Sequence, residues 1–582
     1  MSATSKAAVS YAVDLTHPAS HLVRVTITIP ETGPATQIQF PAWNALYQIR
    51  DFVRNVQDLQ AKCSGQRLVL APVDLDTWTT GSESCSPLVV TYEVYANKPG
   101  VFSSELIPNH AFLNLAEVLF YLPGRRSQPE RIHFILPEGW KLATFVPQGA
   151  GSADFTAPDY DALVDSPVEA GDFQSYSFQE GGADYRVIVR GDPADYSASR
   201  LLGSIKKIAA AETALMRDVP FSHYTFIFHF LRGGGGMEHR NGTAIAFPAA
   251  ELRTNWEGLE STIAHEFFHL WNVKRIRPQG LEPVDYVHGN DTRDLWFSEG
   301  VTNTYMELAL LRAGLISRRQ FYENLAGDIQ RLEERPARHF QSAELSGLEA
   351  WLEKYPDYGR PERSISYYNK GELLGYLLDL GIRHASSNHH SLDDLMRLLN
   401  QNFAKQHRFF TDRDLEQAIS TLAPPSSWVE TFFGNKVTGT QELDYKKYLG
   451  YAGLELLTET SKQPDWGFQA VRNFDGLVQV ISVEPESGAA RAGLEAGDVI
   501  TQVNGQTLYA LPREVTGVKP GQKIALRVRR GQALLMLKFN LGSRPEVQYR
   551  AKESPNASAE QLRIRNGWLE GKTAGAGNGS NP

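Results

Sequence analysis

The chain has 582 residues, of which 42% are hydrophobic and 21% charged, and its formal net charge is −9. This composition is typical of a soluble globular protein with room for about three or four domains. The acidic charge argues against nucleic acid or an anionic membrane as a partner, because both select clustered Lys and Arg, and the longest apolar runs are too short to span a bilayer.

The first segment, residues 1–172, is predicted to form a β-sandwich-like domain. It is rich in Val, Ile, Thr and aromatic residues that alternate with a period near two, most clearly at 23–30 and 88–96. Its start lacks the apolar core of a secretory signal, so we expect a cytoplasmic location. The two cysteines, Cys63 and Cys85, imply no disulfide framework and no metal spacing, although they could pair.

The second segment, residues 173–436, is predicted to be a mostly helical domain. Its apolar residues recur three and four apart, which is the period of an amphipathic helix. The helices are expected near residues 197–218, 257–273, 298–313, 317–334, 371–385, 391–403 and 412–421.

A polar connector at 434–449 separates this domain from a third one, which we place at 450–541. Short strands and glycines return there. Residues 542–582 are predicted to be a C-terminal tail that is partly disordered, because its end, GKTAGAGNGSNP, contains mainly small and polar residues.

A glycine-rich stretch, GGGGMEHRNGT, occupies residues 233–243. Glycines allow a backbone to come close to a ligand, and a carboxylate directly after them, here Glu238, can receive an ammonium group. The alternative is a flexible turn without a binding role.

The string HEFFH at 265–269 indicates a metal site. On a helix, His265 and His269 lie on one face and can point their imidazoles at the same ion, with Glu266 beside it to accept a proton from water. The flanking sequence STIAHEFFHLWNV is apolar, so these polar groups would need a partner, and a metal ion supplies one.

A catalytic zinc ion usually keeps three protein ligands, so a third one is required. The carboxylates that follow are Glu282, Asp285, Asp291, Asp294, Glu299 and Glu307. The first four lie in a loop that would fix a ligand poorly. Glu299 begins a predicted helix and is therefore the expected third ligand, and Asn303, one turn later, can accept a hydrogen bond from a ligand histidine.

A tyrosine lies at the start of a further predicted helix, in SYYNKGELLGYLLDLGI at 366–382. Tyr368 could donate its hydroxyl hydrogen to an oxyanion that forms on a substrate. Tyr367 is the rival for this role, and buried aromatic packing is the structural alternative for both.

Together, HEFFHLWNVKRIRP and LWFSEGVT resemble the signature of the glycyl aminopeptidase family, which is similar to aminopeptidase N and more distantly to thermolysin. The resemblance extends over most of the chain, including FPAWNALYQIRDF at 40–52. It implies a thermolysin-like catalytic domain and peptide substrates with a free N-terminus, with Gly or Ala preferred as the first residue.

The resemblance also assigns roles to the two other motifs. The Gly-x-Met-Glu stretch of the similar enzymes lines the substrate cleft, which implies that Gly235, Gly236, Met237 and Glu238 contact substrate and that Glu238 binds its amino terminus. Aminopeptidase N has Asn after this glutamate, whereas this chain has His239. The Tyr-x-Lys-Gly motif of the same enzymes selects Tyr368 as the oxyanion donor.

The segment PESGAARAGLEAGDVITQVNGQTL at 485–508 resembles a PDZ domain of the bacterial protease type. Such domains add a peptide strand to a sheet edge and hold its terminal carboxylate on backbone amides. Residues 451–454 resemble the carboxylate-binding loop, although Glu455 follows and would repel a carboxylate. A peptide ligand, or an intramolecular packing role, is therefore expected of this domain.

The sequence thus predicts a multidomain α+β zinc aminopeptidase. One zinc ion per chain would be held by His265, His269 and Glu299, with Glu266 as general base, Tyr368 as oxyanion donor and Glu238 as substrate anchor. Two alternatives remain: a PDZ-bearing scaffold whose peptidase fold is inactive, and a zinc endopeptidase. The native metal is inferred from ligand type.

Overall fold

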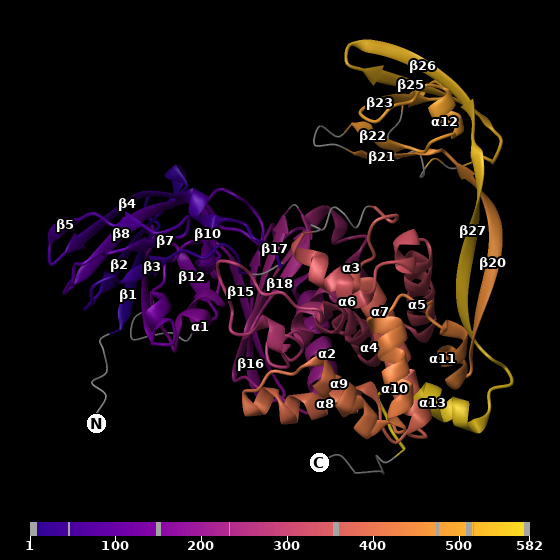
Figure 1. The fold of residues 1–582 in the computed structure, drawn as a ribbon, viewed down its shortest axis with the longest axis horizontal. Coiled ribbons are helices and arrows are strands. Elements are labelled where there is room, and N and C mark those ends of the chain that lie inside the picture. The colour runs from indigo at the N-terminus through magenta and orange to yellow at the C-terminus, as the bar shows by residue number, and fades with distance from the viewer. Residues whose placement is uncertain are drawn as a thin grey trace. The chain divides into compact units, whose positions relative to one another are not determined.

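The computed structural model describes residues 8–44, 47–146, 153–231, 233–352, 360–472, 477–507, 515 and 517–574. The chain divides into two compact units, Met1–Glu455 together with Glu553–Pro582, and Leu456–Lys552. The first unit contains a β-rich part followed by a mostly helical part, and the second is β-rich (Figure 1). The multidomain α+β organisation predicted from the sequence is confirmed.

The N-terminal part is built from three sheets. The largest has seven strands in the order β13-β11-β1-β2-β8-β4-β5, and β8 buries every second residue up to Val94, as the period of two predicts. Its strands are β1 (Val9–Asp14), β2 (Leu22–Ile29), β4 (Val56–Cys63), β5 (Gln66–Leu68), β8 (Leu88–Tyr95), β11 (Glu130–Ile135) and β13 (Asp154–Ala157).

The two smaller sheets have the orders β12-β14-β10-β9 and β3-β7-β6. Their strands, with one short helix, are β3 (Gln37–Gln39), β6 (Ala71–Pro72), β7 (Thr77–Thr79), β9 (Glu105–Ile107), β10 (His110–Leu113), β12 (Lys141–Thr144), β14 (Val168–Gly171) and α1 (Tyr160–Val164). Cys63 and Cys85 form a disulfide in this part of the chain.

The second part opens with a five-stranded sheet of order β15-β16-β17-β19-β18, in which β18 is an edge strand antiparallel to β19. The strands are β15 (Gln174–Glu180), β16 (Ala183–Arg190), β17 (His223–Leu231), β18 (Gly235–His239) and β19 (Gly242–Pro248). Helix α3 (Trp256–Phe268) contacts both β18 and β19.

Helices follow close to the predicted positions. Several start at a serine or threonine whose side chain caps the first turn, as at Ser317, Ser391 and Thr411. They are α2 (Ala198–Met216), α4 (Thr302–Arg312), α5 (Arg318–Glu333), α6 (Ala343–Leu348), α7 (Tyr367–Ala385), α8 (Leu392–Asn402), α9 (Asp412–Leu422), α10 (Ser426–Phe432) and α11 (Tyr445–Tyr451). Within the described residues, no helix is long and apolar enough to cross a membrane.

Two glycines bring α7 against the segment that precedes α4. A Cβ atom on Gly300 would lie 2.4 Å from Cα of Gly371, and one on Gly371 would lie 2.2 Å from the carbonyl oxygen of Trp296. Neither position has room for a side chain, so the backbones touch. This contact places the start of α7 beside Glu299.

The segment 542–582, predicted as a tail that is partly disordered, contains regular elements before its last residues. Strand β27 (Gly542–Glu553) pairs with β20 (Leu454–Asp465), and helix α13 (Ala559–Glu570) follows. Trp568 is fully buried and packs against Phe321 and Tyr376 of the helical part. Helix α13 was not predicted, because its few apolar residues lie among polar ones. Residues 575–582, at the end of the tail, lie outside the described residues.

The second unit contains a sheet in which β21 (Phe468–Arg472) is an edge strand. Its other elements are β22 (Val478–Val483), α12 (Gly488–Arg491), β23 (Val499–Val503), β24 (Gln506–Thr507), β25 (Lys523–Arg530) and β26 (Ala533–Asn540). The apolar core includes Ile524, Leu526 and Val528, all fully buried.

The predicted carboxylate-binding loop at 451–454 does not belong to this unit, which begins after Glu455. A Cβ atom on Gly453 would lie 2.7 Å from Cβ of Ala557, so this glycine packs close to the start of α13. The segment just before the edge strand β21 instead contains Gly467, which has φ +69° and donates its N–H to the side chain of Asp465.

Candidate metal centre and substrate site

Helix α3 presents the two histidines and the glutamate of the HEFFH string. His265 and Glu266 lie in its last turn, and His269 caps its C-terminus while its N–H still bonds to the carbonyl oxygen of His265. The i, i+4 spacing therefore brings the two rings together as expected: their Nε2 atoms are 2.9 Å apart.

Glu299 completes this group from a neighbouring segment. It lies in η7 (Trp296–Val301), a π-helical turn that runs directly into α4, where the sequence predicted a regular helix. Oε2 of Glu299 is 3.4 Å from Nε2 of His265 and 3.3 Å from Nε2 of His269. Such π-helical turns inside helices are frequent at functional sites, because the extra residue redirects one side chain.

Hydrogen bonds at the far side of each ring set the proton positions. His265 donates from Nδ1 to Oδ1 of Asn303 at 2.7 Å, and His269 donates from Nδ1 to the carbonyl oxygen of Asn272 at 2.8 Å. Neutral imidazoles with the proton on Nδ1 have a lone pair on Nε2. Two lone pairs and one carboxylate oxygen converge, and this donor set fits a zinc ion.

The electrostatics of the site also favour a cation. Burial alone would lower the pKa of His269, but the carboxylate of Glu299 outweighs it and raises this pKa to about 10. Burial would raise the pKa of Glu299, yet His269 and His265 hold it well below its ordinary value. The three groups therefore stabilise positive charge at the point where they meet.

A residue of the N-terminal part supports the carboxylate ligand. The hydroxyl of Tyr47 donates to Oε1 of Glu299 at 3.0 Å, and its ring is buried. Tyr47 has φ 46°, a left-handed conformation that tyrosine rarely adopts. The rest of the fold thus imposes a strained backbone to hold this hydroxyl in place.

We expect Tyr47→Phe to weaken metal binding about 10–100-fold, because it removes a hydrogen bond that orients a ligand carboxylate. The metal dissociation constant is measured by competition with a chelator. Tyr286→Phe is the matched control, since the hydroxyl of Tyr286 also donates to a carboxylate, Asp161, at 3.0 Å. Equal metal affinity in the two variants would show that Tyr47 has no such role.

Strand β18 brings Glu238 to the same place. Donor atoms of Glu238, Glu266 and His269 all lie within 4.8 Å of one another. Gly236, two residues before Glu238, has no room for a side chain, because a Cβ atom there would lie 2.2 Å from the carboxylate of Glu266. Alternate residues of this strand therefore face the metal centre.

The other two positions of the glycine-rich motif face away from the metal centre, and their contact with substrate stays a prediction. Met237 is buried in a core cluster with Phe112 and Ile227, and a Cβ atom on Gly235 would meet the ring of Phe102 at 2.7 Å. The sequence predicted that this motif lines the substrate cleft. As a strand it offers only every second residue.

His239 also faces the core. It is buried, and its Nδ1 lies 3.4 Å from Oδ1 of Asp165. The position after the glutamate, whose role the sequence left open, therefore anchors the strand.

Glu266 is buried beside the two histidines. Burial raises the pKa of its carboxyl group well above the ordinary value. A carboxylate in such surroundings is a stronger base than one in water, which suits it to accept a proton.

Helix α7 contributes the tyrosine pair and a polar chain behind His265. Tyr367 is fully buried, whereas Tyr368 is half-buried with its ring centroid 6.1 Å from that of His265. The ring of Tyr368 therefore lies beside a candidate metal ligand. Asn303 hydrogen-bonds Glu372, which in turn accepts from the hydroxyl of Tyr376 at 3.0 Å.

Sequence reasoning missed Tyr47, Asn272 and Glu372. Tyr47 is 252 residues from Glu299 in the chain, and no local pattern links the two. Asn272 acts through its backbone, which any residue could supply. Glu372 directly follows Gly371 of the motif, and its apolar surroundings were the one available signal, because a buried glutamate needs a partner.

Comparison with known proteins agrees with this geometry. Residues 10–172 match the peptidase M61 N-terminal domain, residues 259–374 match M61 glycyl aminopeptidase, and residues 479–530 match a PDZ domain. A crystal structure of an aminopeptidase N family protein from Idiomarina loihiensis is 25% identical, covers 96% of this chain and 100% of that chain, and has a TM-score of 0.86. An M1 zinc metallopeptidase from Deinococcus radiodurans is 15% identical over 75% of this chain and 94% of that chain, with a TM-score of 0.49.

Curated relatives match over a much shorter stretch. A probable periplasmic serine endoprotease DegP-like from Halomonas elongata is 36% identical over 83 residues, 14% of this chain and 18% of that protein. A protein of the same description from Brucella suis is 35% identical over 80 residues, 13% of this chain and 16% of that protein. The chain thus spans less than a fifth of the length of the curated relatives that it matches.

The site geometry and the matched domains agree. The HEFFH residues and the glutamate in the following π-helical turn both lie within the segment that matches M61 glycyl aminopeptidase. The chain thus contains regions that match the N-terminal domain and the catalytic domain of M61 glycyl aminopeptidases, together with a region that matches a PDZ domain.

Proposed function

We propose that the chain is a zinc-dependent aminopeptidase that removes the first residue of peptides. One observation carries the proposal: His269 belongs both to the group with His265 and Glu299 and to the group with Glu238 and Glu266. A metal centre, a base and a carboxylate that can bind an ammonium group are thus adjacent. A preference for Gly or Ala as the first residue, one zinc ion at this centre and Glu266 as general base are parts of the same proposal.

Each residue has a defined task in the reaction. When bound, zinc supplies Lewis acidity, which polarises the scissile carbonyl and makes water more acidic. Glu266 accepts the proton of the attacking water and passes it to the leaving amine. Tyr368 donates a hydrogen bond to the oxyanion. Glu238 binds the substrate ammonium one residue from the scissile bond, so that a single residue is released.

The two alternatives fit the residues less well. An inactive scaffold would have no need to keep the base Glu266 buried beside the ligands together with Tyr368 and Glu299. An endopeptidase would place no carboxylate where the chain of its substrate must continue beyond the cleft. Glu238 lies on an edge strand close to Glu266, which favours a substrate that ends there.

The proposal is tested with aminoacyl nitroanilides, free and N-acetylated, incubated with the full chain before and after removal of metal by a chelator. We expect release from the free Gly and Ala compounds only, abolished by the chelator and restored by zinc. Release that survives complete metal removal would contradict the metal mechanism. Cleavage of N-acetylated compounds at a similar rate would contradict the exopeptidase assignment.

We propose peptides as partners at two places, the metal centre and the PDZ domain. Strand β21 lies at the edge of its sheet, where a peptide strand can add. Nucleic acid and membrane stay outside this proposal, in line with the acidic charge of the chain.

The location of the chain is a separate proposal. The cytoplasm was expected from the sequence, but the disulfide between Cys63 and Cys85 favours an oxidising compartment, because such bonds are rare in cytosolic proteins. We therefore propose an oxidising compartment. Alkylation of free thiols in intact cells, followed by mass spectrometry of the two cysteine peptides, decides between the two: modified cysteines would restore the cytoplasmic expectation.

A further inference from the structure

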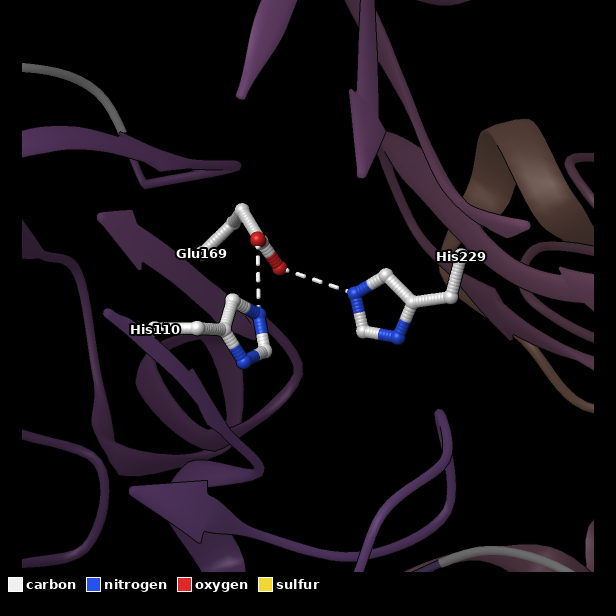
Figure 2. A group of neighbouring side chains, drawn as sticks. All are labelled: His110, Glu169 and His229. Atoms are coloured by element: carbon white, nitrogen blue, oxygen red, sulfur yellow. Dashed lines mark hydrogen bonds and ion pairs between the residues drawn. The ribbon is translucent and has the colours of Figure 1, made fainter. Parts of the chain in front are cut away.

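A second cluster of metal-binding side chains lies away from the catalytic residues. His110, Glu169 and His229 are all buried, and one donor atom of each lies within 4.8 Å of the others. Figure 2 shows the carboxylate of Glu169 between the two imidazole rings. The proposed reaction uses none of these residues.

Three strands from two sheets supply the cluster. His110 is on β10 and Glu169 on β14, which are antiparallel neighbours in the four-stranded sheet, and His229 is on β17 in the five-stranded sheet. The cluster therefore links the N-terminal part to the catalytic part. Its residues are fixed by strand pairing, which suits a site of defined geometry.

The contacts within the cluster are short but incompletely hydrogen-bonded. Nε2 of His229 lies 2.9 Å from Oε2 of Glu169, and this contact is a hydrogen bond. Nε2 of His110 lies 2.8 Å from Oε1 of Glu169, but the two groups are not aligned as a hydrogen bond. Nδ1 of His110 lies 3.3 Å from Oε2 of Glu105, again without the alignment of a hydrogen bond, so both nitrogens of this ring face carboxylates in ion-pair contacts.

Buried polar atoms without a hydrogen bond are rare in proteins, and an ion is one of their usual partners. Ligand atoms around an ion point at the ion and not at each other, which produces short contacts without hydrogen-bond alignment. In the catalytic group one carboxylate oxygen lies 3.3–3.4 Å from both rings, whereas in this cluster each oxygen of Glu169 faces a different ring. The donor set is the same: two histidines and one glutamate.

The charges around the cluster are compatible with a bound cation. Glu105 lies 3.3 Å from Nδ1 of His110, and Arg190 lies 3.5 Å from the same carboxylate oxygen of Glu105. The guanidinium of Arg190 can therefore balance Glu105. The fully buried carboxylate of Glu169 still requires positive charge, because an uncompensated buried charge is costly.

We propose that His110, Glu169 and His229 form a second metal site, which takes a zinc-type divalent ion. One nitrogen from each imidazole and a carboxylate oxygen of Glu169 supply three ligand atoms of the kinds that bind zinc. Since all three residues are buried, the ion holds the two sheets together and does not take part in turnover.

The test is the number of tightly held zinc ions in the full chain, measured by elemental analysis after loading with zinc and gel filtration. We expect two ions in the unchanged chain and one in His269→Ala, which removes a ligand of the catalytic group. We also expect one ion in His229→Gln, held at the catalytic group. This ion should be lost when His269→Ala is added to the same chain. These counts need no activity, so they stand apart from the proposed aminopeptidase function.

Several outcomes would overturn the proposal. A single ion in the unchanged chain, lost entirely in His269→Ala, would mean that Glu169 is held by protons and hydrogen bonds alone. Two ions in a folded His229→Gln chain would place the second ion elsewhere. If circular dichroism shows that this variant is unfolded, Glu169→Gln, which preserves the size of the side chain, replaces it, and two ions in that variant would overturn the proposal equally.

Discussion

Replacing Glu266 with glutamine is expected to lower kcat by about 10³-fold while the chain still binds its metal ion. Glutamine has the size of glutamate, so it fits against the backbone of Gly236, which leaves no space for a larger group. It cannot accept a proton from water, and the proposed reaction therefore loses its base. The measurements are kcat on a free alanyl nitroanilide and zinc content by elemental analysis.

Glu257→Gln is the matched control, because Glu257 lies in the first turn of the same helix, α3, and makes a hydrogen bond to Gln320 there. It should leave kcat within about twofold, as is usual for substitutions away from a site. If Glu266→Gln keeps its metal and loses less than about tenfold in kcat, another group takes the proton and the base is misassigned.

The second large effect concerns Glu238. We expect Glu238→Ala to lower kcat/KM for substrates with a free amino group by about 10²-fold or more, because it leaves the substrate ammonium without its partner carboxylate. Most of the loss should appear in substrate binding and positioning, since Glu238 does not transfer a proton. The measurement is kcat/KM for a free and an N-acetylated aminoacyl nitroanilide with each protein.

The ratio of kcat/KM for the free substrate to kcat/KM for the N-acetylated substrate serves as the internal control. The unchanged chain should discriminate strongly in favour of the free amine, and Glu238→Ala should reduce that discrimination. Glu238→Gln keeps a polar side chain without charge and should lie between the two. Equal losses on free and blocked substrates would indicate that Glu238 shapes the site without reading the amino terminus.

The convergence of the candidate metal ligands could be predicted because its information is local or has a strict spacing. Histidines four apart on an apolar helix must share a face, so the position of His265 and His269 followed from helix geometry alone. Glu299 and Asn303 were predicted because both lie on the next strongly periodic segment. Even there, the sequence suggested a regular helix, whereas the structure has a π-helical turn at Glu299.

What the sequence did not reveal depends on contacts between distant segments. Tyr47 reaches Glu299 only through the packing of one domain on another, and the Gly300–Gly371 contact requires two helical segments to be known in advance. The packing of Met237 into the core was not predicted, because a motif states which residues occur and not which side of a strand they occupy. Helix α13 was missed because its apolar residues bury themselves against other helices and lie in a polar stretch.

The return of the chain to the catalytic unit at Glu553 affects the order in which the protein can be completed during synthesis. A ribosome that has released residues up to 455 has not yet made Trp568, so the pocket among Phe321 and Tyr376 that this side chain fills stays open to water until the PDZ unit has emerged. The N–H of Ser554 then donates to the carbonyl oxygen of Gly453, so the two ends of the insertion meet. The PDZ unit is therefore an insertion between Gly453 and Ser554. Replacing it with a short linker that joins these two residues should remove the unit and keep helix α13 in the catalytic part.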